Sequence, residues 1–270
     1  HKGNQIFRFA FCEISDTPSN IKAKFKNDPQ GYSDYQKAIK ESFEENIKGY
    51  DNIIVSSEFL FLSDNDEIAT IKAYLTNLGF TEIHVIMYLR DPAKYYLSVA
   101  QQALKNHYKL PSPSGFRYEM LEAINNWRSI NVASFTLKEF DRACLYKGDV
   151  IEDFSKSLRE LGLSVSLAIS SKSNESMSVE GTTVLQEFHR LLSISNYSND
   201  IIKEKKLNAR RFSNKVTKGT KSVLAPTLVN YIHGRYSNEI AEILKLYGVF
   251  SSLNTSSEYL TDIAEPLFFT

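Results

Sequence analysis

The sequence has little cysteine, no long apolar run and no net charge. Cys12 and Cys144 are the only cysteines in 270 residues. They are too few for the disulfide framework of a small secreted domain or for a multi-ligand zinc cluster, and we expect both to be buried thiols. No apolar run approaches the ~20 residues that span a bilayer, so we expect a soluble, cytoplasmic protein. Because 32 Lys and Arg residues balance 32 Asp and Glu residues, any anion-binding site must be local.

The composition is that of a folded domain. Hydrophobic residues make up 42% of the chain and aromatic residues 12%, which supports a sizeable core and excludes a disordered protein. Short apolar runs alternate with longer helical patterns, and this alternation indicates an α/β fold with a central parallel sheet flanked by helices. We expect one such domain over residues 1–250 and a peripheral tail over 251–270.

The patterns of strands and helices are clearest after residue 50. Asp64 and Glu67 form a capping-box pattern, and Pro92 fits the first turn of a helix. A strand–helix–strand–helix unit between 50 and 106 should have a right-handed crossover. β-rich runs predict strands at 52–57, 83–89 and 132–137. Helices are predicted to follow Asp64, Asp91 and Asp149, and another should include Trp127. Two further helices are predicted, one with an apolar face of Val184, Leu185, Phe188, Leu191 and Leu192 and a last one at 237–247.

Polar residues follow two of the predicted strands, as Ser56-Ser57-Glu58 and as Arg90-Asp91-Pro92. Ligands of open α/β sheets bind beyond the carboxyl ends of the strands. Arg90, with Ser98 about two turns into the next helix, can bring a guanidinium and a hydroxyl to one anion, aided by free N–H groups at the helix amino end. The alternative is an ion pair of Arg90 with Asp91 or Glu58.

The segment around Arg90 is similar to a known family. Tyr88-Leu89-Arg90-Asp91-Pro92, followed by Tyr95, Ser98 and Gln101, resembles the 3′-phosphate-binding strand and helix of sulfotransferases that use 3′-phosphoadenosine 5′-phosphosulfate (PAPS). The resemblance covers residues 50–250 and favours bacterial carbohydrate-type members with a P-loop NTPase-like fold. It also includes, in order, Ile54–Glu58, Trp127, Phe135–Phe140, Gly148–Phe154, Leu161-Gly162, Asn174–Ser178 and Ser237–Glu239.

The resemblance implies roles for individual residues. Arg90 and Ser98 would bind the 3′-phosphate of PAPS, and Trp127 would approach the adenine unless it is a core residue. No metal and no nucleic acid are implied; the acceptor would be a hydroxyl or amine of a saccharide or glycolipid, such as a capsular polysaccharide. Glu58 is the predicted general base, in a cleft where partial desolvation raises its basicity, and His1 is the second candidate. The structural alternative for Glu58 is to pair with Arg90 or cap a turn.

One part of the family pattern is missing. No Lys-Thr-Gly-Thr-like loop for the phosphosulfate precedes Asn52, and we interpret Thr217–Ser222 as a decoy because it follows a polar helical stretch. Since the first residue is His1, we expect that loop to lie upstream in a longer product.

Other interpretations stay open at this point. A non-catalytic nucleotide- or glycan-binding module and a nucleotide kinase or glycosyltransferase are the alternatives to a sulfotransferase. The basic stretch at 203–221 would cover a nucleotide, bind an acidic saccharide or be a solvated helix face. We expect the acceptor to meet loops at 13–34 and 106–118. The remaining histidines, His84, His107, His189 and His233, have no metal-ligand spacing and carry little weight.

Overall fold

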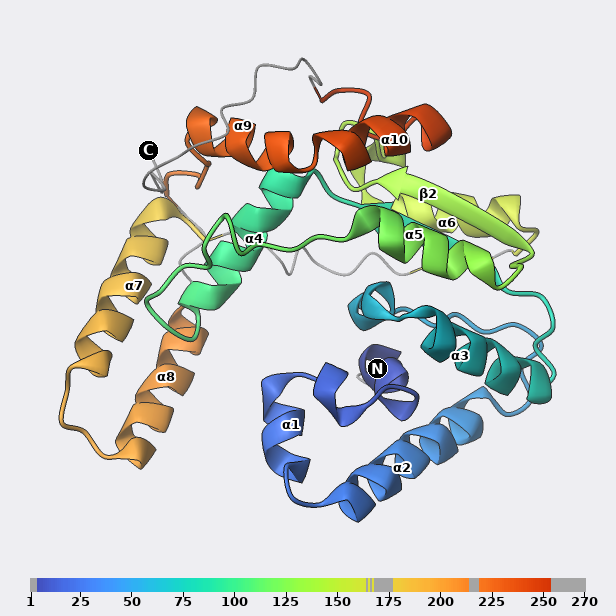
Figure 1. The fold of residues 1–270 in the computed structure, drawn as a ribbon, viewed down its shortest axis with the longest axis horizontal. Helices are drawn as coiled ribbons and strands as arrows, with labels where there is room; N and C mark the ends of the chain where they lie inside the picture. The colour runs from blue at the N-terminus through green and yellow to red at the C-terminus, as the bar shows by residue number, and fades with distance from the viewer. Residues whose placement is uncertain (1–3, 164, 166, 168–176, 214–218, 254–270) are drawn as a thin grey trace. The chain divides into compact units, whose positions relative to one another are not determined.

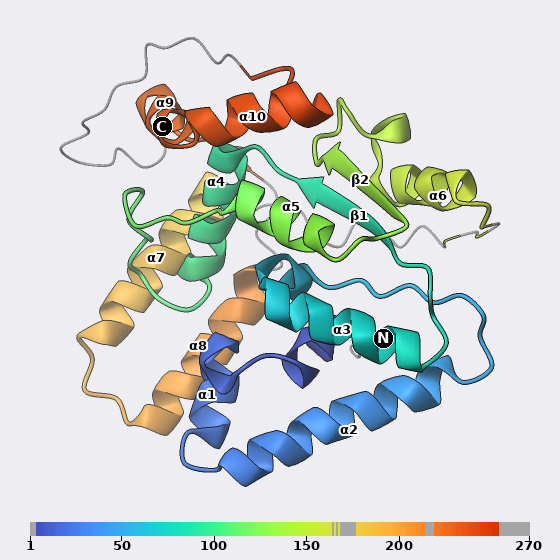
Figure 2. The same cartoon turned by 45° about the vertical axis from the view of Figure 1, so that its right-hand side comes forward.

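Helices dominate the structure, a computed structural model that describes residues 4–163, 165, 167, 177–213 and 219–253. The chain divides into two compact units, one made of residues 1–87 and 119–136 and the other of 88–118 and 137–270 (Figures 1 and 2). The sheet of the described residues has two strands, β1 (His84–Leu89) and β2 (Ser134–Glu139). Ala133 N donates to Ile83 O and Phe140 N to Leu89 O, so the strands are parallel. The expected α/β class is confirmed, with a smaller sheet.

The first unit is built from helices around a phenylalanine-rich core. Phe7, Phe43, Ile71 and Leu75 are buried together, and the rings of Phe7 and Phe43 lie 4.6 Å apart. Residues 13–34, expected to be a loop, contain helices instead. The helices of the first unit are the 3₁₀ helices η1 (Asn4–Ala10), η2 (Ile14–Asp16) and η3 (Glu58–Leu62) and the α-helices α1 (Ser19–Phe25), α2 (Pro29–Ile47), α3 (Asn65–Asn77) and α5 (Met120–Ser129).

The strand predicted at 52–57 is wrong. These residues belong to no strand, and alternate residues are exposed. Ile53 and Val55 pack on the helical core around Phe43 and Ile71, so the β-branched run buries one side without pairing in a sheet. The predicted strand–helix–strand–helix unit therefore lacks its first strand.

A buried ion pair crosses the first unit. Asp64 caps α3 as predicted, because its Oδ1 accepts a 2.8 Å hydrogen bond from Glu67 N. The Glu67 side chain is buried and binds Arg8 instead of closing a capping box. Arg8 Nε and Nη2 donate to its two carboxylate oxygens at 2.8 and 2.9 Å. This forked pair ties η1 to α3.

The second unit places α4 (Pro92–Leu104) among other helices. Tyr96, Ala100 and Leu104 are fully buried at helical spacing, as the apolar pattern predicted. Gln101 Nε2 donates to Met177 O at 3.2 Å, and α4 packs against α7 and α9. The other elements are η4 (Tyr146–Gly148), α6 (Val150–Glu160), α7 (Val179–Ser193), α8 (Asn199–Ser213), α9 (Pro226–Arg235) and α10 (Ser237–Tyr247).

Several predicted boundaries are confirmed in this unit. Asp149 caps α6 by accepting from Ile151 N at 2.8 Å, and Gly248 ends α10 with φ +68°. β2 begins and ends two residues later than predicted. The apolar face predicted for α7 is only partly buried, because Val184 and Leu191 are 54% and 50% exposed.

Other expectations have mixed outcomes. Cys12 is buried, but Cys144 is exposed, so the expectation of two buried thiols is wrong for Cys144. No helix in the described residues is long and apolar enough to cross a membrane. The single domain over 1–250 stays a prediction. His1, 174–176, 217–218 and 254–270 lie outside the described residues.

We expect Glu67→Ala to destabilise the first unit by about 3–5 kcal/mol, because it leaves the Arg8 guanidinium buried without its counter-charge. Trp127 is the only tryptophan and lies in this unit, so its fluorescence during urea unfolding measures the change. The double replacement Arg8→Met with Glu67→Leu should recover most of the loss. Glu41→Ala, which breaks the exposed Lys37–Glu41 pair, is the control and should change stability by less than about 0.5 kcal/mol. A Glu67→Ala variant as stable as this control would contradict the role of the pair.

Candidate functional site

The turn from β1 into α4 gathers the polar groups that the sequence singled out. β1 is held by β2 up to its last residue, since Phe140 N donates to Leu89 O at 2.6 Å. Pro92 is the first residue of α4, where its missing N–H costs nothing. Arg90 and Asp91 are therefore fixed between a paired strand and the start of a buried helix.

Asp91 is the capping residue of α4 and is 6% exposed. Its Oδ1 accepts from Ala93 N at 2.7 Å, from Lys94 N at 3.3 Å and from His233 Nε2 at 2.9 Å. Burial alone would raise the pKa of Asp91, but the hydrogen bond and charge of His233, with the two backbone N–H groups, lower it below its ordinary value. The carboxylate is thus ionised, and its Oδ1 accepts all three of these hydrogen bonds.

This arrangement corrects two expectations. Asp91 already accepts from two N–H groups at the amino end of α4, so these groups are not free for an external anion. The alternative ion pair of Arg90 with Asp91 is also absent from the described residues, in which Asp91 pairs with His233. An anion at this site would depend on side chains.

Arg90 is half-buried and held by its surroundings at two points. Its backbone N donates to the Tyr118 hydroxyl at 3.0 Å, and its guanidinium carbon lies 5.8 Å from the ring centre of Phe140. Its Nε is buried and has no hydrogen-bond partner among the described residues. A buried donor without an acceptor costs about 1–3 kcal/mol, which a bound anion would recover.

Aromatic rings pack around Tyr118, whose hydroxyl accepts the hydrogen bond from the backbone N–H of Arg90. Tyr118 and Tyr95 have ring centres 4.4 Å apart, and Phe116 contacts both rings and that of Tyr96. Tyr236, the residue between α9 and α10, packs its ring on that of Phe116 and donates its hydroxyl to Phe116 O at 3.2 Å. Burial raises the pKa of the Tyr118 hydroxyl, so it remains a neutral acceptor for the Arg90 N–H.

Two other cations of this unit already have carboxylate partners. Lys94 pairs with Asp141, and Lys138 Nζ lies 2.7 Å from Asp153 Oδ2. Asp153 also accepts from Tyr88 Oη at 2.7 Å and from Tyr146 N at 2.9 Å. Burial would raise the pKa of Asp153, but these hydrogen bonds, led by that of Lys138, lower it. The unpaired Nε distinguishes Arg90 from Lys94 and Lys138.

The predicted site residues are divided between the two units. Arg90, in the turn after β1, and half-buried Ser98, on α4, belong to the second. Glu58 belongs to the first, where it begins η3 and is exposed, so the expected partial burial of its carboxylate is wrong. Trp127 is 8% exposed and donates Nε1–H to Leu60 O at 3.0 Å, which confirms the alternative that it is a core residue. His1 lies outside the described residues.

Sequence reasoning missed His233, Tyr118 and Phe140. His233 lies 142 residues from Asp91 in the chain and was given little weight because its spacing suggests no site. Tyr118 and Phe140 are single aromatic residues among many in the sequence. No local pattern identifies them, because their contacts with Arg90 and Asp91 depend on the packing of α9 and on the strand pairing.

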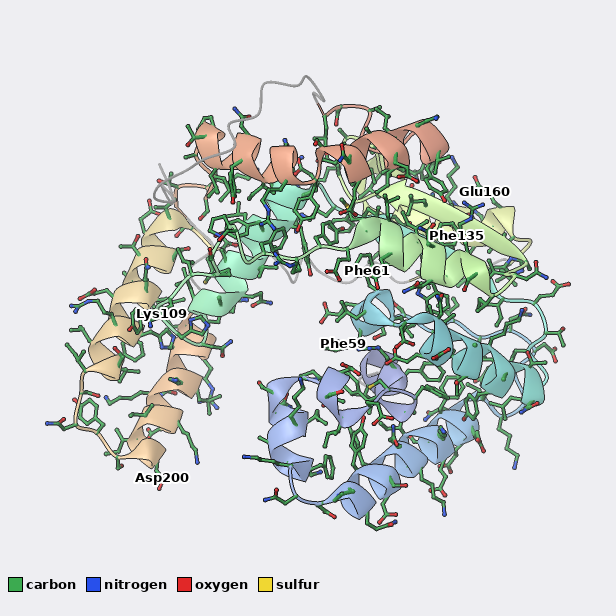
Figure 3. The ribbon with its side chains drawn as sticks, viewed as in Figure 1. Phe59, Phe61, Lys109, Phe135, Glu160 and Asp200 are labelled. Carbon is green, nitrogen blue, oxygen red and sulfur yellow. The ribbon has the colours of Figure 1, made fainter. Side chains whose placement is uncertain are left out.

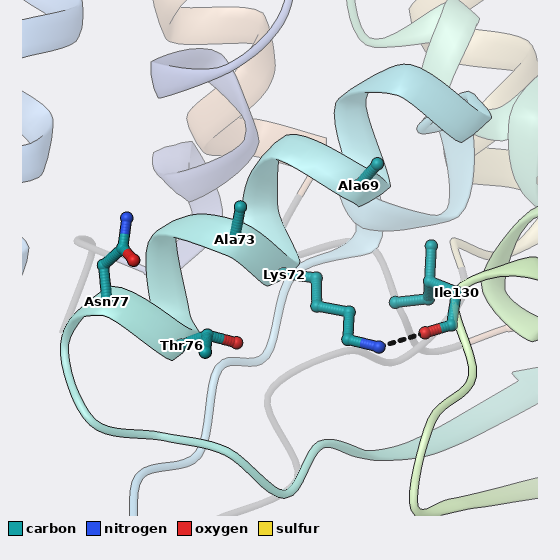
Figure 4. A pocket seen from close by; sticks show the side chains of 6 residues that line it. All are labelled: Ala69, Lys72, Ala73, Thr76, Asn77 and Ile130. Atoms are coloured by element: carbon teal, nitrogen blue, oxygen red, sulfur yellow. Dashed lines mark hydrogen bonds between the residues drawn. The ribbon is translucent and has the colours of Figure 1, made fainter.

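A surface depression of ≈ 480 Å³ on the first unit is lined mostly by apolar groups, unlike the turn around Arg90 (Figure 4). Ala69, Ala73 and Ile130 make its lining mostly apolar. Lys72 donates to Ile130 O and, at 3.2 Å, to Asn131 O, so its ammonium satisfies carbonyl groups at the end of α5. This depression therefore offers little to an anion.

Comparisons with known proteins identify no relative, so the site is interpreted from its chemistry. No family model, no curated protein and no solved structure matches the chain. In the described part of the chain, no group of three or more His, Cys, Asp or Glu side chains could hold a metal ion.

We expect Asp91→Asn to destabilise the second unit by about 1–3 kcal/mol at pH 7, because the amide cannot replace the charge-assisted bonds to His233 and the α4 amino end. The folded state lowers the pKa of Asp91, so its contribution is complete above the ordinary value of about 3.9 and is lost as pH falls through the lower folded value.

Thermal unfolding of the wild type and of Asp91→Asn between pH 7 and pH 3 tests the direction of this pH dependence. The difference in unfolding temperature between the two proteins should become smaller toward pH 3. Asp149→Asn, at the cap of α6, is the matched control because Asp149 accepts from two backbone N–H groups in the same unit. Equal losses for the two variants at pH 7, or a gap that widens toward acid, would contradict the account.

Proposed function

We propose that this protein is a sulfotransferase with a P-loop NTPase-like fold, which transfers a sulfonate group from PAPS to a hydroxyl or amine of a saccharide or glycolipid in the cytoplasm. The observation that carries the proposal is the buried Nε of Arg90, which follows β1 and has no hydrogen-bond partner in the part of the chain that the structure describes. It stands in the segment whose sequence resembles the 3′-phosphate site of that family.

The guanidinium of Arg90 can bind a phosphate through directed hydrogen bonds as well as through its charge. A guanidinium presents several N–H donors in one plane and binds phosphate oxygens in a forked geometry. The Phe140 ring supports its face, which limits the orientations that it can take. Ser98, on α4, would add one neutral donor to the same phosphate. Both residues match the family pattern in identity and spacing.

Sulfonyl transfer assigns a separate role to a base. The acceptor oxygen attacks sulfur, the S–O bond to the 5′-phosphate breaks, and 3′-phosphoadenosine 5′-phosphate leaves. The acceptor proton must be removed during this step. Glu58 is exposed and accessible to an acceptor from solvent, and its carboxylate would take that proton. Trp127 has no part in the proposed donor site because its ring is buried and its N–H is bonded.

A non-catalytic nucleotide-binding module is the second candidate. One observation favours it: Glu58 is exposed and lacks the burial expected of a base with raised basicity. Such a module would bind the donor through Arg90 without turnover. Binding and turnover experiments together separate the two candidates.

We expect the wild-type protein to bind 3′-phosphoadenosine 5′-phosphate more tightly than adenosine 5′-phosphate, because only the former carries the group that Arg90 recognises. Arg90→Ala should remove most of this preference, a loss of about 2–3 kcal/mol in calorimetry, and Ser98→Ala should cost less. Arg142→Ala, an exposed arginine of the same unit, is the control and should bind as the wild type does. Equal wild-type affinity for both nucleotides would remove the 3′-phosphate from the proposal.

We expect Glu58→Gln to retain donor binding and reduce turnover by about a hundredfold or more, since an amide cannot accept the acceptor proton. Transfer of labelled sulfonate from PAPS to a saccharide acceptor measures turnover. Glu45→Gln, another exposed glutamate of the first unit, should keep normal turnover. If Glu58→Gln is equally active, Glu58 is structural and His1 becomes the candidate base. Donor binding without turnover in the wild type would support the non-catalytic module.

A further inference from the structure

The hairpin of α7 and α8 exposes more large apolar side chains than its length would suggest. It contains seven of the fourteen large hydrophobic residues that are exposed in the described chain. Three of them lie where the helices join: Ile194 is 68% exposed, Tyr197 50% and Ile201 41%. We call these three residues the hairpin tip. Scattered apolar residues are normal on a surface, but a cluster of this kind indicates an interaction site.

The apolar tip is accompanied by positive charge. α8 contains five basic residues and two acidic ones, although the whole chain is neutral. Lys203 and Lys206 are exposed in the first turns of α8, and Lys205 Nζ lies 5.0 Å from the ring centre of Tyr197. Lys203 Nζ also lies 3.8 Å from Asp200 Oδ1, and Arg211 is exposed near the other end of α8. Long basic side chains can lie along apolar groups while their charged ends reach outward. The surface around the tip is therefore apolar, and it carries three lysines against the two carboxylates of Asp200 and Glu204.

The tip residues are not needed to hold the hairpin together. Met177, Leu185 and Ala209 form the core between the helices, with Phe188 packed against them. The other end of α7 is fixed, because Val179 N donates to Thr220 O at 2.9 Å and Ser178 pairs with Lys221. α7 has 15 residues, so the tip lies about 22 Å from this anchor. Figures 1 and 2 show the connection at the end of the hairpin away from α9, and Figure 3 marks Asp200 beside it.

We propose that the hairpin tip docks on a lipid bilayer that contains anionic lipids. Ile194, Tyr197 and Ile201 would enter the interfacial region, where tyrosine and aliphatic side chains are favoured. Lys203, Lys205 and Lys206, in the first turns of α8, would contact lipid phosphates. An acidic polymer in solution would use the basic residues but gain nothing from an exposed isoleucine pair. The combination of an apolar end and flanking cations fits a bilayer surface.

Sedimentation with vesicles tests this docking. The full chain should bind vesicles of phosphatidylcholine with phosphatidylglycerol about tenfold more strongly than vesicles of phosphatidylcholine alone, and added salt should weaken the binding. The tip variant Ile194→Asn with Tyr197→Ser and Ile201→Asn should lose about tenfold in binding. The basic variant Lys203→Gln with Lys205→Gln and Lys206→Gln should lose about as much.

Two control variants match these changes outside the hairpin. Tyr50→Ser with Leu62→Ser and Leu246→Ser removes exposed apolar groups, and Lys26→Gln with Lys37→Gln and Lys48→Gln removes exposed charges. Both should bind vesicles as the wild type does, with unchanged circular dichroism. Arg90→Ala should also bind normally, so this test is independent of the proposed sulfonate transfer.

Several results would overturn the inference. The wild type could fail to sediment with either vesicle, or the tip and basic variants could bind as well as the controls. A concentration-dependent dimer that the tip variant abolishes, without lipid binding, would assign the tip to a second copy of the chain. If the tip variant fails to fold, loss of binding in the folded basic variant, together with salt dependence, still decides the question.

Discussion

The carboxylate of Asp91 accepts hydrogen bonds from the start of α4 and from His233, and the rest of the second unit depends on this arrangement. It fixes the point at which β1 stops and α4 begins. It also links α4 to α9, whose residue His233 is itself 8% exposed. A buried carboxylate is tolerated in a protein only when its hydrogen bonds compensate for lost hydration, so the helices and the strand end must be placed together.

The position of Arg90 follows from the same constraint. Since Asp91 is engaged by His233 and the helix, it does not neutralise its neighbour in the sequence. Tyr118 holds the Arg90 backbone, Phe140 supports the guanidinium, and Nε has no partner in the described residues. The structure thus separates a carboxylate that organises the fold from a cation that is available for a ligand. This separation is the physical basis of the donor site that we propose.

Local signals in the sequence were sufficient for much of the second unit. Asp91, Asp149 and Gly248 mark helix boundaries through contacts with their immediate neighbours, and the run at 84–89 pairs as a strand. The run at 52–57 also contains consecutive β-branched residues, but it packs on helices, because its own residues do not determine whether a partner strand is present.

The site residues show the same limit. Arg90 and Ser98 could be proposed from a strand end and a helix, whereas His233 could not, since it reaches Asp91 across 142 residues. Glu58 was expected in a cleft because a strand was expected before it. When the strand was absent, the carboxylate was exposed at the start of η3. Predictions made from local patterns were confirmed where local contacts decide the structure.

The most direct test of the donor site observes Arg90 itself. In a protein labelled with ¹⁵N-arginine, the Nε–H signal of Arg90, assigned from Arg90→Lys, can be followed by NMR while 3′-phosphoadenosine 5′-phosphate is added. A phosphate bound to Nε should shift this signal and slow its exchange with water, and adenosine 5′-phosphate should cause neither change. An Nε–H signal that remains unchanged at saturating nucleotide would contradict the central claim that Arg90 binds the 3′-phosphate.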